Sequence, residues 1–342
     1  MFNSRLSMFL KVFGPIVLKN REPILKTRYV MSLVVGLGYC SVDYIGVVPH
    51  IPSSDEKIRM TKIMRQGGGV TGTAMVTVSR LGLKTAIVWC VGGDENGKFV
   101  ISDLADEGVD ISHMMVAQGL LTPVSYVLVD ETSGKRTIAF YYDETLLEHI
   151  AKADLNWISE AGALYIDGVH EASIRAAMIA KENRIPVFCS TAEYASEYDR
   201  IISYVDVFIA SLDWVCSITN RREPSEAARV LLRAGPKMVA VTLGDQGSLC
   251  VTKDEVIKKE AFRVNVVDTT GAGDVYSGAF VYGMLQEWPL DFVVEFSNAV
   301  AAMKCRKFGG RAGIPKLAEV RVFMREHGKS LLPGKYLPTE PP

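Results

Sequence analysis

The stretch Val264-Asn-Val-Val-Asp268-Thr-Thr-Gly271-Ala272-Gly273-Asp274-Val-Tyr-Ser-Gly278-Ala-Phe280 predicts a strand, a glycine-rich turn and then an apolar helix. Gly271 and Gly273 have no Cβ, so backbone amides can converge in this turn. The first turn of the helix adds N–H groups without intrahelical acceptors and the positive end of the helix dipole. The pattern therefore predicts an anion-binding site at residues 271–274.

Asp274 stands at the start of this helix, where its carboxylate can accept a proton from a substrate hydroxyl. Phosphoryl transfer requires a positioned alcohol, a base and donors for the phosphoryl oxygens, and residues 271–274 offer the last two. The simpler interpretation is an N-capping aspartate after a glycine turn. For an isolated Gly-Ala-Gly-Asp run the capping interpretation is favoured. The choice between a cap and a catalytic base therefore depends on the rest of the sequence.

The surrounding sequence alternates apolar, β-branched runs with amphipathic segments of helical length. This alternation is typical of an α/β fold with a mostly parallel sheet covered by helices. We expect buried strands at 32–37, 85–91, 163–166, 186–189, 205–210 and 238–242. We expect helices at 72–81, 97–107, 173–182, 225–234, 275–286 and 291–304.

Two stretches depart from this alternation. Residues 44–64 predict strand, proline-containing turn and strand, and residues 120–142 predict a hairpin about the turn Asp130-Glu-Thr-Ser-Gly134. Strands inserted in this way suit a small second sheet standing off the main domain. Such a sheet is a candidate lid that excludes water from a transferring group.

Further polar and glycine-rich runs follow predicted strands along the chain. Gly36-Leu-Gly38 leads to Asp43, and a carboxylate there suits two vicinal hydroxyls because it accepts hydrogen bonds from both. A Rossmann dinucleotide turn is disfavoured, because Ser41 stands at the third glycine position. The run Gly92-Gly-Asp-Glu-Asn-Gly-Lys98 resembles a Walker loop, but Phe99 replaces the magnesium-binding hydroxyl, so we interpret it as structural.

In this order the runs resemble the signatures of the phosphofructokinase-B family, also called the ribokinase family, over about residues 32–314. The pattern D-T-x-G-A-G-D matches residues 268–274 at every key position. The resemblance implies a ribokinase-like three-layer α/β/α sandwich with a β-sheet lid, and phosphorylation of a sugar hydroxymethyl group by ATP with Mg²⁺. It assigns Asp274 as general base and Gly271, Ala272 and Gly273 to the anion hole.

The same resemblance assigns the ligand contacts. Sugar binding falls to Asp43, to Gly67, Gly68 and Gly69, and to Thr73, which replaces the family's asparagine. Nucleotide binding falls to Thr242, Gly244, Gly247, Asn298 and Ser211. The N-x-x-E element that helps to place magnesium is altered, because Ser211 and Trp214 replace its asparagine and glutamate. Asp213, one position earlier, is a candidate to supply the lost charge.

In related kinases, backbone carbonyls near Asp268 and Thr270 and in the run after residue 305 hold a monovalent cation, often potassium. The C-terminal run resembles 6-deoxy-6-sulfofructose kinases in particular, so Lys57 and Arg136 are candidates to meet an anionic sugar substituent. The alternative is that both are solvated edge-strand charges. Phe140, at a position where a polar lid residue is expected, weakens the sulfosugar interpretation.

Composition sets the remaining limits. A net charge of −1 gives no argument for a nucleic-acid partner, and the apolar stretch at residues 8–18 is too short and interrupted to span a membrane. We expect residues 1–30 to be a basic extension outside the fold and residues 331–342 a loose tail. Six scattered cysteines without a C-x-x-C pair predict free thiols in a reducing cytoplasm. The family resemblance implies pairing through the lid, so we expect a homodimer.

Two alternative functions use the same fold. A nucleoside kinase would be favoured by a bulky aromatic side chain in the substrate pocket, positioned to stack on a base. A non-catalytic nucleotide-binding regulator is suggested only by the altered element at residues 211–214, and the intact Asp274 argues against it.

Overall fold

The computed structural model describes residues 33–190 and 197–329, and the predicted extension and tail lie outside these residues. A central sheet has the strand order β14-β13-β12-β11-β10-β9-β1-β4-β5, with β6 also pairing with β4. Pairing is parallel except along β12-β13-β14. The strands are β1 (Val34–Leu37), β4 (Thr85–Gly92), β5 (Val109–Asp110), β6 (Met114–Ala117), β9 (Ala163–Ile166), β10 (Val187–Ser190), β11 (Val207–Ser211), β12 (Met238–Thr242), β13 (Ser248–Thr252) and β14 (Val256–Lys259).

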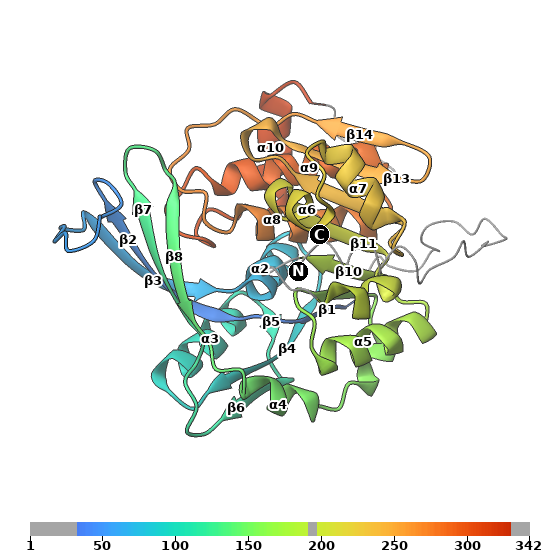
Figure 1. Ribbon diagram of the computed structural model, residues 1–342, viewed down its shortest axis with the longest axis horizontal. Helices are drawn as coiled ribbons and strands as arrows, with labels where there is room; N and C mark the ends of the chain where they lie inside the picture. The colour runs from blue at the N-terminus through green and yellow to red at the C-terminus, as the bar shows by residue number, and fades with distance from the viewer. Residues whose placement is uncertain (1–32, 191–196, 330–342) are drawn as a thin grey trace, which may run out of the picture.

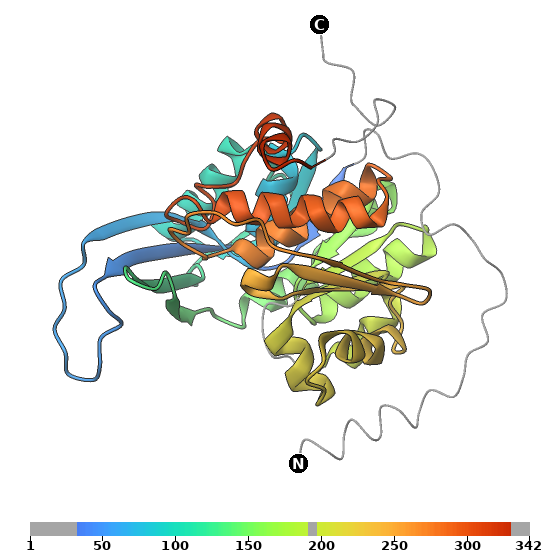
Figure 2. The ribbon, with the colours of Figure 1, turned by 90° about the horizontal axis from the view of Figure 1, so that it is seen from above.

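Helices cover both faces of this sheet (Figures 1 and 2). One layer holds α2 (Val70–Arg80), α8 (Ala272–Leu285), α9 (Leu290–Lys304) and α10 (Leu317–Glu326), with α3 (Glu95–Asp106) beside the β4–β5 edge. The other layer holds α4 (Leu146–Ala151), α5 (Glu171–Glu182), α6 (Leu212–Thr219) and α7 (Pro224–Leu232). Short 3₁₀ helices lie at Asn156–Glu160, Tyr198–Arg200, Ile202–Tyr204 and Gly244–Gln246.

Helix α8 is the central helix of its layer because it is apolar on every side. All its residues from Val275 to Leu285 are buried, between α2 and α9. A Cβ on Gly278 would lie 2.5 Å from the carbonyl oxygen of Ala74, so the two helix backbones approach closely there. This packing fixes the position of the α8 N-terminus.

A second sheet projects from the side of the sandwich (Figure 1). Its strand order is β3-β2-β7-β8, formed by β2 (Ser41–Val48), β3 (Lys62–Gly68), β7 (Val124–Asp130) and β8 (Arg136–Tyr141). Asp130 and Gly134 close the β7–β8 hairpin: the Asp130 carboxylate accepts from two turn amides, and Gly134 has φ +66°. Alternate residues of this sheet face the central domain, and we call this sheet the lid.

The predicted three-layer architecture, the mostly parallel sheet and the small second sheet are all confirmed. The six predicted strands and six predicted helices are present, with ends shifted by up to three residues. Helices α6 and α10 and the antiparallel pair β13–β14 were not predicted. The six cysteines carry no disulfide, and five of them are buried, in agreement with prediction. No helix within residues 33–190 and 197–329 has both the length and the apolar character to cross a bilayer.

Candidate functional site

A cavity of about 580 Å³ lies between the inner face of the lid and the carboxyl ends of the central strands. Its lining combines residues from the lid, from the start of α2 and from the turn before α8. The predicted site residues that line it are Asp43, Gly69, Thr73, Arg136, Ser211, Thr242, Thr270, Gly271, Gly273 and Asp274. Segments more than 200 residues apart in the chain therefore meet in one space.

The N-terminus of α8 opens into this cavity. Gly271 is its N-cap residue with φ +72°, a left-handed conformation that favours glycine. No described backbone carbonyl accepts from the amides of Gly273 and Asp274, and a Cβ on Gly273 would meet nothing within 4 Å. The Ala272 amide differs from prediction, because it donates to the Thr269 carbonyl at 3.2 Å. The free donors for an anion are thus those of Gly273 and Asp274.

Two carboxylates, those of Asp43 and Asp274, line the cavity. Burial raises the pKa of Asp274 to about 7; Arg136 opposes this shift, and the negative charges of Asp167 and Asp43 add to it. Asp43 is 8% exposed and accepts a hydrogen bond from the Ser41 hydroxyl at 3.1 Å. Burial also raises the pKa of Asp43, with Arg311 as the main opposing charge. A base with a pKa near 7 is well matched to proton transfer at neutral pH.

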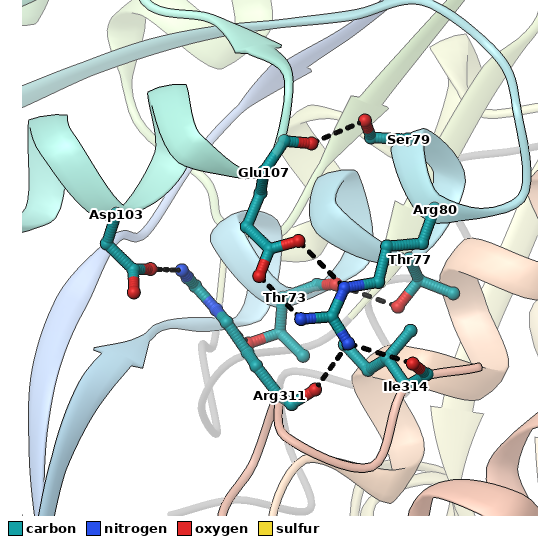
Figure 3. Close-up of polar contacts among 8 residues, drawn as sticks. All are labelled: Thr73, Thr77, Ser79, Arg80, Asp103, Glu107, Arg311 and Ile314. Atoms are coloured by element: carbon teal, nitrogen blue, oxygen red, sulfur yellow. Dashed lines mark hydrogen bonds and ion pairs between the residues drawn. The ribbon is translucent and has the colours of Figure 1, made fainter. Parts of the chain in front are cut away.

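Arg311 is buried, and its guanidinium points toward Asp103 (Figure 3). Its guanidinium donates to Asp103 at 2.6 Å, to the Gly68 carbonyl at 2.6 Å and to the Thr73 hydroxyl at 3.3 Å. These bonds join the loop after α9 to α2, to α3 and to the end of β3. Sequence reasoning assigned no role to this side chain.

Arg80 supports the same loop from the other side (Figure 3). It forms a bidentate ion pair with Glu107 and donates to the carbonyls of Arg311 and Ile314, at 3.0 and 2.8 Å. Together the two guanidiniums fix the loop at residues 311–314.

Of the three glycines predicted to approach the sugar, one lines the cavity. Gly69, with φ +85°, lines the cavity, but Gly67 and Gly68 do not. A Cβ on Gly67 would lie 2.1 Å from an Asp103 oxygen, and one on Gly68 would lie 2.1 Å from an Asp43 oxygen. These two glycines make room for carboxylates behind and beside the site.

Asp167 was also missed by sequence reasoning. It is buried, lines the cavity and accepts from the amides of Tyr39 and Thr71, both on Oδ2, at 2.9 and 3.0 Å. Burial raises the pKa of its carboxyl to about 6. Asp167 thereby anchors the first turn of α2 to the end of β9. A polar residue directly after the buried run at 163–166 was the available signal.

Ser211 and Thr242 also line the cavity. They are register partners at the carboxyl ends of β11 and β12. The Ser211 hydroxyl accepts from the Trp214 amide at 3.3 Å and caps α6, while the Trp214 ring packs against Tyr198 and Phe208. Asp213 is exposed and does not line the cavity, so it gives no charge there.

The other predicted nucleotide contacts lie outside the cavity lining. The Asn298 amide donates to the carbonyls of Lys259 and Glu260 and accepts from Ser248, so it fastens the end of β14. Gly247, with φ +93°, lets the Lys259 carbonyl approach, and Gly244 has φ +62° in the turn beside Thr242. Asn298, Gly244 and Gly247 therefore shape the wall behind Thr242.

Lys57 and Arg136 are not brought together. Lys57 is exposed in the loop between β2 and β3 and does not line the cavity, whereas Arg136 lines it and donates to the Thr269 hydroxyl at 3.1 Å. The Walker-like turn has the predicted structural role: Asp94 caps α3 through the Gly97 amide, and Lys98 pairs with Glu95 in solvent.

Asp268 is fully buried beside the α8 turn. Its carboxylate accepts from the amides of Thr270 and Gly309, at 2.8 and 2.9 Å, and its carbonyl accepts from the Lys304 ammonium at 2.9 Å. No cluster of three or more histidine, cysteine or acidic side chains suited to a metal occurs within the described residues.

Comparisons with known proteins agree with this geometry. A family described as pfkB family carbohydrate kinase matches residues 31–317. The chain is 27% identical to a ribokinase of Haemophilus influenzae, over 85% of this chain and 97% of that protein. It superposes on the ribokinase of Thermotoga maritima with a TM-score of 0.75 at 25% identity, covering 86% and 100% of the two chains. Ribokinase of Arabidopsis thaliana, solved with ribose and ATP, has the same fold, with a TM-score of 0.75 at 21% identity over 86% and 99%.

Proposed function

This chain belongs to the pfkB family of carbohydrate kinases, and from that premise we propose that it transfers the γ-phosphoryl group of ATP to a hydroxymethyl group of a sugar. The observation that carries the proposal is the convergence of Asp43, Asp274 and the free amides of Gly273 and Asp274 in one cavity. Asp43 can bind sugar hydroxyls, Asp274 can act as the base, and the two amides can bind an anion. Phosphoryl transfer requires these three functions.

In the proposed reaction, Asp43 and Thr73 hold the sugar hydroxyls at the α2 side of the cavity. Asp274 takes the proton of the acceptor hydroxyl while that oxygen forms a bond to the γ-phosphorus, and the bond from this phosphorus to the β–γ bridging oxygen breaks to release ADP. The amides of Gly273 and Asp274 donate to the γ-phosphoryl oxygens as their charge redistributes. Ser211 and Thr242 line the same cavity, and we propose that they contact the nucleotide.

Magnesium enters this proposal with ATP, whose phosphates supply most of its ligands. When bound, it neutralises charge on the β- and γ-phosphates. Of the residues at the altered element, the hydroxyl of Ser211 would be the one to contact the ion, because Trp214 is packed in the core and Asp213 is exposed outside the cavity. We therefore propose a looser protein contact to the ion than the N-x-x-E element gives.

The lid residues favour an uncharged sugar over a sulfosugar. The inner face of the lid presents Val127, Ile138 and Phe140 to the cavity. Of the two cations predicted to meet an anionic substituent, only Arg136 lines the cavity, and its guanidinium donates to the Thr269 hydroxyl. Lys57 does not line the cavity. An anionic substituent would thus lack the paired cations that the sequence suggested.

The test combines a substrate screen with one substitution. A phosphorylation screen with ATP over hexoses, pentoses, sugar phosphates, sulfosugars and nucleosides should identify the acceptor. Asp274→Asn should then lower kcat by about a thousandfold, as expected for loss of a general base, with the KM for ATP nearly unchanged. Asp213→Asn, an exposed aspartate outside the cavity, is the matched control. Near-normal kcat in Asp274→Asn contradicts the assignment of the base.

A nucleoside acceptor is the second candidate, because the cavity holds aromatic side chains. Phe140, on the inner face of the lid, is 55% exposed. Tyr39, Trp89 and Tyr142 also line the cavity. A base stacked on such a ring gains affinity that a sugar alone does not. The ratio of kcat/KM for a nucleoside to that for its free sugar separates the two candidates.

We further propose that two copies pair through the outer face of the lid. This face is apolar and open: Ile63 is 74% exposed, Tyr126 59% and Met60 46%, and they border a hollow of about 310 Å³. A contiguous apolar surface on a projecting sheet is typical of a protein–protein interface. Light scattering should give a dimer that Ile63→Asp converts to monomer, whereas Val322→Asp, an exposed residue of α10, should not.

A further inference from the structure

Lys304, the last residue of α9, has no exposed surface. Its ammonium donates to the backbone carbonyl of Asp268 at 2.9 Å, and the Asp268 side chain is equally buried. Burial lowers the pKa of Lys304, whereas the negative charge of Asp268 raises it and so favours the charged form. A lysine this deeply enclosed needs a partner of opposite charge and an acceptor, and it has both.

The backbone segments on either side of this contact are hydrogen-bonded to each other. The Cys305 carbonyl accepts from the amides of Val267 and Asp268, at 2.8 and 3.2 Å, and the Gly309 amide donates to the Asp268 carboxylate. The loop after α9 is thereby fastened to the segment before α8. This is the region where the family resemblance implies a monovalent cation held by backbone carbonyls.

The oxygen atoms of Asp268 are not available as ligands for a free cation. The Asp268 carbonyl already accepts from the ammonium, and both Asp268 carboxylate oxygens accept from backbone amides. A second positive charge would also be repelled by the first. Two unit charges about 4 Å apart near a protein surface repel enough to weaken binding by about a thousandfold.

We propose that the Lys304 ammonium takes the place of the free monovalent cation, so that this kinase works without potassium. The inference rests on the proposed function, because the segment that Lys304 holds leads directly into the anion site at Gly273 and Asp274. Thr270, whose amide is fixed by the Asp268 carboxylate, immediately precedes the Gly271 cap. The charge also acts on the base, since Lys304 opposes the upward shift of the Asp274 pKa.

The first experiment measures the unmodified enzyme in potassium chloride and in tetramethylammonium chloride at equal ionic strength. Its kcat should agree within about twofold, and its melting temperature should not differ between the two salts. ²⁰⁵Tl NMR, with thallium as a potassium analogue, should detect no bound ion. Stimulation by potassium of tenfold or more, or a bound thallium ion that potassium displaces, would overturn the proposal.

The second experiment compares Lys304→Ala with Lys304→Met. The alanine variant leaves space and an unpaired carbonyl, so its kcat in tetramethylammonium should fall at least tenfold and recover with potassium, ammonium or methylammonium. The methionine side chain fills the space, so Lys304→Met should fall equally and not recover. Wild-type kcat for Lys304→Ala without added cation would contradict the inference.

Stability and binding separate this inference from the proposed function. The melting temperature of Lys304→Ala should rise with potassium but not with tetramethylammonium, whether or not the acceptor is known. If Lys304→Ala does not fold, the thallium and potassium measurements on the unmodified protein decide. If Asp274→Asn retains activity, the assignment of the base fails, while the cation measurements still judge Lys304.

Discussion

The Arg311 guanidinium and the Asp103 carboxylate form an ion pair at 2.6 Å in which the Arg311 side chain is only 4% exposed. Arg311→Met should lower the free energy of unfolding by about 3 kcal/mol, because removing one partner leaves a carboxylate without its cation. It should also raise the KM for the acceptor, since Arg311 holds the Gly68 carbonyl and the Thr73 hydroxyl. Urea unfolding and steady-state kinetics measure the two effects.

A matched control for this prediction is Lys98→Met, which removes the exposed ion pair with Glu95 on the same helix α3. An exposed pair of this kind contributes little, so no measurable change in stability is expected. Equal stability of the two variants would show that the Arg311 network does not stabilise the fold.

Asp274 predicts how activity depends on pH. Its pKa is raised to about 7, and only the ionised carboxylate accepts a proton. The value of kcat/KM for the acceptor should therefore rise about tenfold per pH unit up to about pH 7 and level off above it. In Asp274→Asn the residual activity should lack this limb. A wild-type profile that is flat between pH 5 and 8 would count against Asp274 as the base.

The raised pKa of Asp274 also predicts that the stability of the fold decreases over the pH range in which activity increases. A carboxyl whose folded pKa is raised binds its proton more tightly in the native state, so stability falls as pH rises from about 4 to about 7. Asp274→Asn removes this cost. The variant should therefore be more stable than the wild type at pH 8, and the difference should vanish below pH 4. Thermal unfolding across pH measures it, and lower stability of the variant at pH 8 would contradict the expectation.

Substitutions at Asp167 test whether its acceptor oxygen stabilises the fold, because two backbone amides donate to the same Oδ2 atom. Asp167→Ala leaves the amides of Tyr39 and Thr71 without this acceptor and should cost about 2 kcal/mol of stability. Asp167→Asn keeps one carbonyl oxygen, which suffices for both amides, so its stability should stay near that of the wild type. Urea unfolding of the pair decides. Equal loss in both variants would mean that the charge of Asp167, and not its acceptor oxygen, is required.

The parts of the site that the sequence predicts are local in the chain. The turn from Asp268 to Asp274 combines its glycines, its helix start and its candidate base within seven residues, and the structure places Gly271 at the N-cap of α8 as predicted. Arg311 and Asp167 were missed because their partners are remote: Gly68 is 243 positions from Arg311, and Thr71 is 96 positions from Asp167. Local patterns carry no information about such pairs.

Two predicted site residues lie outside the cavity lining for similarly specific reasons. Asn298 stands on α9 beside the end of β14, a strand that was not predicted, and the carbonyls of Lys259 and Glu260 occupy its amide. Lys57 was assigned to a lid strand, but β3 begins only at Lys62, so Lys57 lies in the preceding loop. Alternation of apolar residues predicts that a strand exists more reliably than it predicts where the strand begins.

Phe140 predicts how the acceptor is recognised. Its ring is 55% exposed on the inner face of the lid, and its register partner Ser125 also lines the cavity. Phe140→Ala should raise the KM for a nucleoside acceptor at least tenfold through loss of stacking, and that for a free sugar only a few-fold, with the KM for ATP unchanged in both cases. Tyr126→Ala is the matched control, because Tyr126 is an aromatic residue on the outer face of the lid. The control should leave acceptor KM values unaltered in the enzyme at dimer-forming concentration. An equal rise in the KM for ATP, or an unchanged acceptor KM in Phe140→Ala, would show that the inner face of the lid does not contact the acceptor.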